Sequence, residues 1–274
     1  GKRLPFKNAP TIFLVTGMAA GFAGMFGTPI AAVIFAVEVL AAGEMRYQAL
    51  LPAFTAAFSA STVASMLGIR KEVIPLHIQA ELSPFLLVRL ITLGILFGIT
   101  GGLFAWSLKQ TKKYLGEKIT NPWIRVAAVG VVLSILFLVL HQGRYCGFGM
   151  SLVEDVFDGK KIYAYDWALK FILTILTLSA GFQGGEVTPL FTIGATLGAV
   201  LGSLFGIPME LSAALGYAAV FGGGTNTLLA AIFIGGEIFG YEYLPYFFVV
   251  CTAAYVFNRN SSIYSRQKLT KYSI

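Results

Sequence analysis

Long apolar runs, separated by short basic loops or by Gly- and Pro-containing breaks, organise this chain of 274 residues. An α-helix needs about 20 apolar residues to span a bilayer, and three runs come close to that length: residues 49–67, 84–108 and 122–140. Shorter segments lie at residues 11–26, 30–42, 151–157, 167–180, 190–203, 210–221, 225–239 and 243–257. The pattern predicts an all-α polytopic membrane protein, because a β-barrel would show short segments of alternating hydrophobicity.

Several of these segments are too short or too rich in glycine to cross a membrane alone. Gly27-Thr28-Pro29, for example, divides residues 11–26 from residues 30–42, and we expect neither piece to span by itself. Irregular backbone at membrane depth persists only inside protein or along a water-filled cavity. Broken helices whose ends point at the midplane are typical of transporters and channels, so the pattern favours those classes over a bundle of simple spans.

Composition and charge agree with a membrane protein. The chain is 57% hydrophobic and 12% charged, against about 25% charged residues in an average soluble domain. The net charge of +7 does not indicate nucleic acid, because the cations lie in loops between apolar runs. The basic loop 109–125 and the basic tail 258–274 are placed in the cytoplasm by the positive-inside tendency. We therefore expect a multi-pass protein of the cell membrane with a cytoplasmic C-terminus.

Residues for metal binding or hydrolysis are missing from the sequence. Cys146 and Cys251 form no disulfide framework, and His77 and His141 lie far apart without ligand spacing. No HExxH, GxSxG or CxxC motif occurs. We expect no metal, no cofactor and no enzymatic activity.

An internal repeat is visible without gaps. Residues 17–38, GMAAGFAGMFGTPIAAVIFAVE, and residues 216–237, GYAAVFGGGTNTLLAAIFIGGE, agree at nine of 22 positions at an offset of 199. Glycine and alanine inflate such matches, but Phe22, Thr28 and Glu38 also stand in register. We predict one transmembrane domain, residues 1–274, built as an inverted repeat, with the first half ending near residue 80 and the second covering about 81–274. A repeat of this length would begin upstream of Gly1, so we expect a fragment that lacks its N-terminal part.

The segment GFQGGEVTP, residues 181–189, predicts a helix start at a glycine-rich turn. Proline is favoured in the first turn of a helix, and Gly184 and Gly185 allow a close backbone approach. A helix start presents unpaired N–H groups and the positive end of the helix dipole. Inside a membrane this is a ready anion site; the alternative is an ordinary helix N-terminus in a packed core.

Three acids lie within apolar surroundings, where an ionisable group is a functional candidate. Glu38 and Glu237 occupy the same place in the two repeats, near helix ends, which favours a structural role in capping or in pairing with loop cations. Glu186 stands at the predicted helix start. It makes a charge–dipole contact there, or it couples proton movement, or it competes with a bound anion. Tyr264 is either an interfacial tyrosine or a hydroxyl donor within the cavity.

Three stretches carry a resemblance to a known family. GGEVTPLFTIGATLG, residues 184–198, is similar to the GGxFxPxLxxGA motif of the CLC family of chloride channels and proton-coupled anion antiporters. Residues 17–38 resemble that family's paired helices midway along its transport domain, and NSSIYSRQ, residues 260–267, resembles the segment with its pore tyrosine. The matches occur in family order and cover nearly the whole chain.

The resemblance implies an α-helical homodimer in membrane lipid with one ion pathway per subunit. A small inorganic anion, fluoride or chloride, would bind at Gly185, Glu186, Val187 and Thr188, with backbone N–H groups of Glu186 and Val187 and the hydroxyl of Tyr264 as donors. Glu186 is the candidate for proton coupling. The family's motifs with the inner serine and with the gating glutamate do not occur, and we expect them before Gly1.

Two departures from the family pattern favour one branch. Chloride antiporters of the family carry an internal proton glutamate directly after the position of Glu38, where this chain has Val39. The Glu-Val-Thr sequence at residues 186–188 is similar to the fluoride/proton antiporter branch, which lacks that glutamate as well. Fluoride export is therefore favoured over a chloride channel or a chloride/proton antiporter. Another inverted-repeat secondary transporter, with a cation at Glu186, and a non-transporting membrane bundle remain as alternatives.

Overall fold

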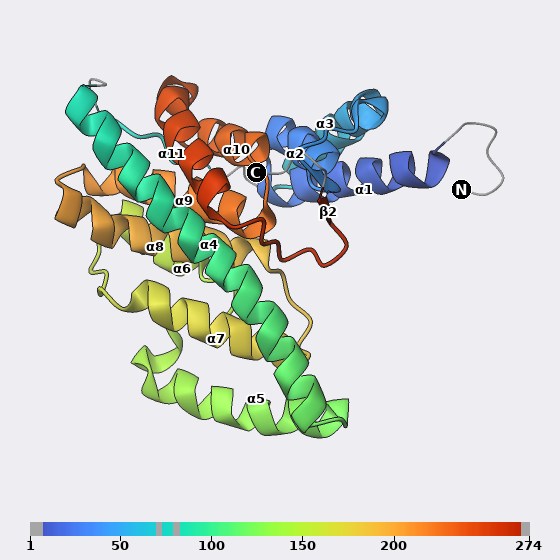
Figure 1. Ribbon diagram of the computed structural model, residues 1–274, viewed down its shortest axis with the longest axis vertical. Helices are drawn as coiled ribbons and strands as arrows, with labels where there is room; N and C mark the ends of the chain where they lie inside the picture. Colours follow the sequence, from blue (N-terminus) through green and yellow to red (C-terminus); the bar gives the residue numbers. More distant parts are fainter. Residues whose placement is uncertain (1–7, 70–72, 79–82, 270–274) are drawn as a thin grey trace.

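The computed structural model describes residues 8–69, 73–78 and 83–269, and it is almost entirely helical (Figure 1). The helices of the first part are α1 (Ala9–Phe26), α2 (Pro29–Glu38) and α3 (Leu50–Met66). The remaining α-helices are α4 (Pro84–Lys118), α5 (Pro122–Val139), α6 (Met150–Phe157), α7 (Asp166–Ala180), α8 (Val187–Phe205), α9 (Met209–Thr225), α10 (Leu229–Phe239) and α11 (Leu244–Phe257). Short 3-10 turns lie at Tyr47–Ala49, His141–Gly143 and Tyr241–Tyr243.

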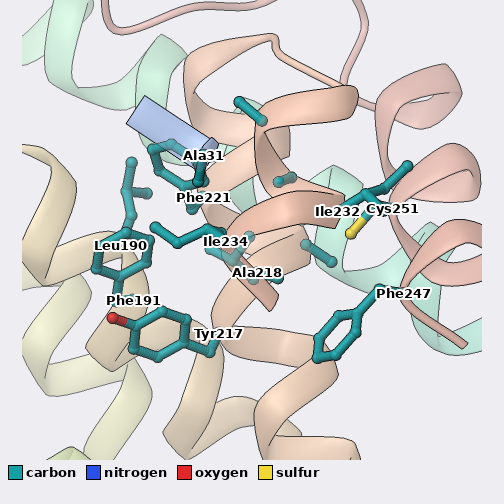
Figure 2. Close-up of a cluster of buried hydrophobic side chains, with 14 of the residues drawn as sticks. Ala31, Leu190, Phe191, Tyr217, Ala218, Phe221, Ile232, Ile234, Phe247 and Cys251 are labelled. Carbon is teal, nitrogen blue, oxygen red and sulfur yellow. The ribbon is translucent and has the colours of Figure 1, made fainter. Parts of the chain in front are cut away.

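The long helix α4 crosses the whole molecule and divides it into two regions (Figure 1). On one side of α4, α2 packs against α10, with α1 and α3 packed against α2 and α11 packed against α10. Helices α5 and α7 lie toward the other end of α4. Helices α8 and α9 form the centre, where Phe191 stacks on Tyr217 with ring centroids 4.1 Å apart. Figure 2 shows this buried cluster, in which Leu190 and Phe191 of α8 lie beside Tyr217 and Phe221 of α9.

Helices α8 and α9 approach at backbone contact. A Cβ atom built on Gly194 would collide with the carbonyl oxygen of Gly216, and one built on Gly216 would collide with that of Gly194. Only glycine allows two helices to come this close, as in other membrane helix pairs. The paired glycines therefore fix how deeply α8, and the segment at its start, is buried.

The two matching segments of the repeat cap each other. The Glu38 carboxylate, at the end of α2, accepts hydrogen bonds from the amides of Leu228, Leu229 and Ala230 at the start of α10, at 2.7, 3.1 and 2.9 Å. In return, the Glu237 carboxylate near the end of α10 accepts from the amides of Ile30 and Ala31 at 3.2 and 2.7 Å. Because the end of each helix caps the start of the other, α2 and α10 run in opposite directions. These hydrogen bonds confirm the predicted capping role of Glu38 and Glu237.

Element boundaries differ from the sequence prediction most clearly in three places. The prediction of a loop at 109–125 is wrong for residues 109–118, because α4 continues as helix to Lys118. The segment expected at 30–42 ends as helix at Glu38, and Ala41–Ala42 (β1) pairs instead with Lys268–Leu269 (β2). Helix α1 has 18 residues, so it is long and apolar enough to span and our expectation of a short piece does not hold. In the described residues, five helices meet that criterion.

Candidate functional site

Helix α8 begins where the sequence predicts, at Val187, directly after the glycine-rich turn. Gly181 ends α7 with a φ of 109°, a left-handed conformation that favours glycine. Glu186 is the N-cap residue of α8, yet its side chain accepts no hydrogen bond from that helix. Pro189 has no N–H of its own. The amides of Val187 and Thr188 are thus left without a side-chain cap at the positive end of a buried helix.

Val187 and Thr188 line a cavity of about 480 Å³, together with every other residue of the predicted anion site. Gly185, Glu186, Val187, Thr188 and Tyr264 all line it. The other lining residues come mainly from the first repeat and are largely apolar: Met18, Gly21, Phe22, Met25, Phe26, Phe35, Val39, Leu40, Phe148, Arg266 and Gln267. The fold thus brings residues 185–188 and Tyr264, which lie far apart in the sequence, into one space. An apolar chamber with a few convergent polar groups is typical of a binding site.

Tyr264 is held in place by its neighbours along the chain. The amide of Ile263 donates to the carbonyl of Gly224 at 2.9 Å. The Gln267 side chain donates to the carbonyls of Val39 and Thr225, both at 3.0 Å. Burial raises the pKa of the Tyr264 phenol, and the nearby Glu186 carboxylate raises it further. The hydroxyl therefore keeps its proton and remains a hydrogen-bond donor.

Phe148 also lines the cavity, and sequence reasoning missed it. Two side chains hold the backbone at this point. The carbonyl of Phe148 accepts a hydrogen bond from Thr192 Oγ1 at 3.2 Å, and the carbonyl of Gly147 accepts one from Lys170 Nζ at 2.7 Å. Lys170 is only 2% exposed. Phe148 and Gly185 also line a second cavity of about 950 Å³ beside α5 and α7, so both residues stand where the two spaces meet.

Glu186 makes its ion pair with a different helix. Its Oε1 atom lies 2.8 Å from Nζ of Lys112, near the end of α4, and the two side chains are 21% and 44% exposed. Neither the sequence motif nor the repeat pointed to Lys112, because no local pattern links residue 112 to residue 186. The sequence indicated only that Lys112 is a basic residue, in a segment that we expected to be a loop.

The remaining candidates lie elsewhere. Glu38 and Glu237 are used as helix caps and do not line the cavity. Cys146 and Cys251 are free thiols, and His141 contacts the Tyr165 hydroxyl at 2.9 Å. Over residues 8–69, 73–78 and 83–269, no group of His, Cys, Asp and Glu has the geometry to hold a metal ion.

Comparison with known proteins decides the family. A family model described as voltage gated chloride channel matches residues 2–259, which is most of the chain. The chain belongs to the CLC family. The expected fold class is confirmed by the same comparisons.

Relatives of this CLC chain include fluoride-related proteins. It is 36% identical to the chloride/fluoride channel protein of Pseudomonas syringae pv. tomato over 94% of this chain and 58% of the relative. It is 25% identical to the voltage-gated ClC-type chloride channel ClcB of Salmonella typhi, over 92% of this chain and 64% of the relative. It superimposes on the crystal structure of a CLC-type fluoride/proton antiporter with a TM-score of 0.93 and 49% identity, over 94% of this chain and 66% of that one. The chain thus spans about three fifths of the curated relatives that it matches.

Proposed function

We propose that this CLC chain belongs to a transporter that exports fluoride across the cell membrane in exchange for protons. The observation that carries the proposal is the single cavity lined by Glu186, Val187, Thr188 and Tyr264 at the uncapped start of α8. The similarity to a solved CLC-type fluoride/proton antiporter supports it, as does the relative named a chloride/fluoride channel protein.

The chemistry of the cavity suits a small halide. In this proposal the amides of Glu186 and Val187 supply N–H donors, the amide of Thr188 adds a third, and the dipole of α8 adds positive potential. Tyr264 and Thr188 supply hydroxyl donors to the same space. Fluoride is the smallest halide and the strongest hydrogen-bond acceptor among them, so several short donors replace its hydration shell better than an apolar wall does. In this proposal Glu186, the one acid among the described residues that line the cavity, takes up and releases the proton.

The arrangement in the membrane forms part of the same proposal. The reciprocal caps between α2 and α10 support an inverted repeat, with its first half ending near residue 80 and its second covering about 81–274. The lysines at the end of α4 and the basic C-terminal tail are placed in the cytoplasm. We place two copies in one homodimer, as the family resemblance implies.

Ion efflux from liposomes that contain the natural full-length protein tests this function. Fluoride and chloride gradients are compared in parallel, with electrodes for each anion and a pH dye for protons. We expect fluoride efflux far above chloride efflux, accompanied by proton uptake. Efflux that favours chloride would assign the protein to the chloride branch. Absence of any halide efflux, with a sodium-dependent flux in its place, would move it to another class of transporter.

A further inference from the structure

Glu186 occupies a capping position without capping. An acid at the N-cap ordinarily accepts hydrogen bonds from the second or third amide of its own helix. In α8 that contact is not made. The carboxylate reaches instead to Lys112 of α4, with 2.8 Å between Oε1 and Nζ. The amide of Thr188, the nearest partner that a capping carboxylate would take, is thereby left without a side-chain acceptor.

Two alternative partners therefore compete for one carboxylate. The first is the Lys112 ammonium, which is 44% exposed at the edge of the protein. The second is the start of α8, where both the amides and the dipole attract negative charge. A carboxylate that turned to α8 would occupy the donors that a halide needs. The position of Glu186 thus decides whether the proposed site is open.

We infer that Lys112 is a positioning residue that holds the Glu186 carboxylate away from α8 and so keeps the halide cavity open. The inference rests on the proposed function. The other charged or titratable groups that face Glu186 across the cavity are Tyr264 and Arg266, both from the C-terminal segment. Tyr264 is neutral. Arg266 belongs to the cavity lining itself, whereas Lys112 does not line the cavity and binds the Glu186 carboxylate from outside it.

Lysine replacement separates this role from a general effect of charge. Lys112→Met removes the ammonium and keeps a long apolar side chain, and Lys112→Arg keeps the charge. Lys113→Met is the matched control, since Lys113 pairs with the exposed Glu117 at 3.9 Å on the same turn of α4. Each change is made in the natural protein and in a Glu186→Gln background, where no carboxylate is present to turn inward.

Fluoride binding to the purified full-length protein, measured by isothermal titration calorimetry, gives the first readout. A partly exposed ion pair biases its groups by up to about 1 kcal/mol, so we expect Lys112→Met to weaken binding by about 2- to 5-fold at neutral pH. The loss disappears in the Glu186→Gln background, where no carboxylate competes. Lys112→Arg restores binding, and Lys113→Met leaves it unchanged.

Amide hydrogen exchange of the peptide that covers residues 184–190 gives a second readout without any halide. Capping by Glu186 in Lys112→Met slows exchange at Thr188, and Glu186→Gln abolishes that slowing. Unchanged exchange in Lys112→Met, or an equal loss of fluoride binding with and without the Glu186 carboxylate, overturns the positioning role. If the unaltered protein binds no fluoride, the proposed function fails, while the exchange experiment still decides where the carboxylate lies.

Discussion

Removal of the Glu38 carboxylate tests the reciprocal capping that joins α2 to α10. Glu38 is 8% exposed, and its two oxygens accept three backbone hydrogen bonds at 2.7–3.1 Å. Hydrogen bonds to a charged group contribute about 1.5–3 kcal/mol each, but neighbouring bonds are not additive. Glu38→Ala leaves three amides without this acceptor, and each buried donor left unsatisfied costs about 1–3 kcal/mol. We therefore expect Glu38→Ala to lower the free energy of unfolding by roughly 3–5 kcal/mol.

The assay is reversible unfolding in mixed micelles, followed by far-UV circular dichroism. Glu210→Ala is the control, because Glu210 is an exposed acid in the first turn of α9, and such surface changes stay within about 0.5 kcal/mol. Glu38→Gln retains one acceptor oxygen but turns an NH₂ group toward the α10 amides, so its loss is intermediate. If Glu38→Ala matches the Glu210→Ala control, the α10 amides have other partners and the capping argument is wrong.

Three further predictions concern the site and its support. Val187→Pro removes one N–H at a position where helices tolerate proline, and we expect it to abolish halide efflux from liposomes while the helical circular dichroism is retained. Tyr264→Phe removes one hydroxyl donor to an anion, worth about 1.5–3 kcal/mol, and should weaken halide binding about tenfold or more by calorimetry. Gly194→Ala places a Cβ against the Gly216 carbonyl and forces α8 away from α9, so it should lower the unfolding midpoint in micelles. Gly21→Ala is the control and should leave the midpoint unchanged, because the added Cβ has no neighbouring atom within 4 Å.

Much of the fold follows from local sequence signals. Pro29, Pro84 and Pro122 mark helix starts that the structure places at those residues, because proline is suited to the first turn. The run of lysines after Leu108 misled us, since charge was taken to mean loop. Lysine and glutamate are good helix formers, and the Lys113–Glu117 pair at i,i+4 is compatible with helix. A helix can therefore continue beyond its apolar span.

The site was predictable only where its residues are neighbours in sequence. Gly185 to Thr188 form one motif at a helix start, so local chemistry pointed to them together. Phe148 and Lys112 come from other parts of the chain, and only the packing of α4, α6 and α8 brings them to the cavity and to Glu186. No periodicity or spacing in the sequence predicts that these residues lie near Glu186. Tyr264 was found through a family resemblance, and its placement depends on the contacts of the C-terminal segment with Gly224 and Val39.

The three acids that the sequence analysis singled out all stand at or near helix ends, and their partners separate structure from function. Glu38 and Glu237 each satisfy amides on a helix of the opposite repeat, so both their charge and those amides are used. Glu186 satisfies none, and its own helix keeps free donors beside a cavity. Carboxylates cap the starts of α2 and α10, and Glu186 is placed where it could cap the start of α8 in the same way. Because the start of α8 is uncapped while its acid is held by Lys112, the open amides are the feature that a halide is best suited to fill.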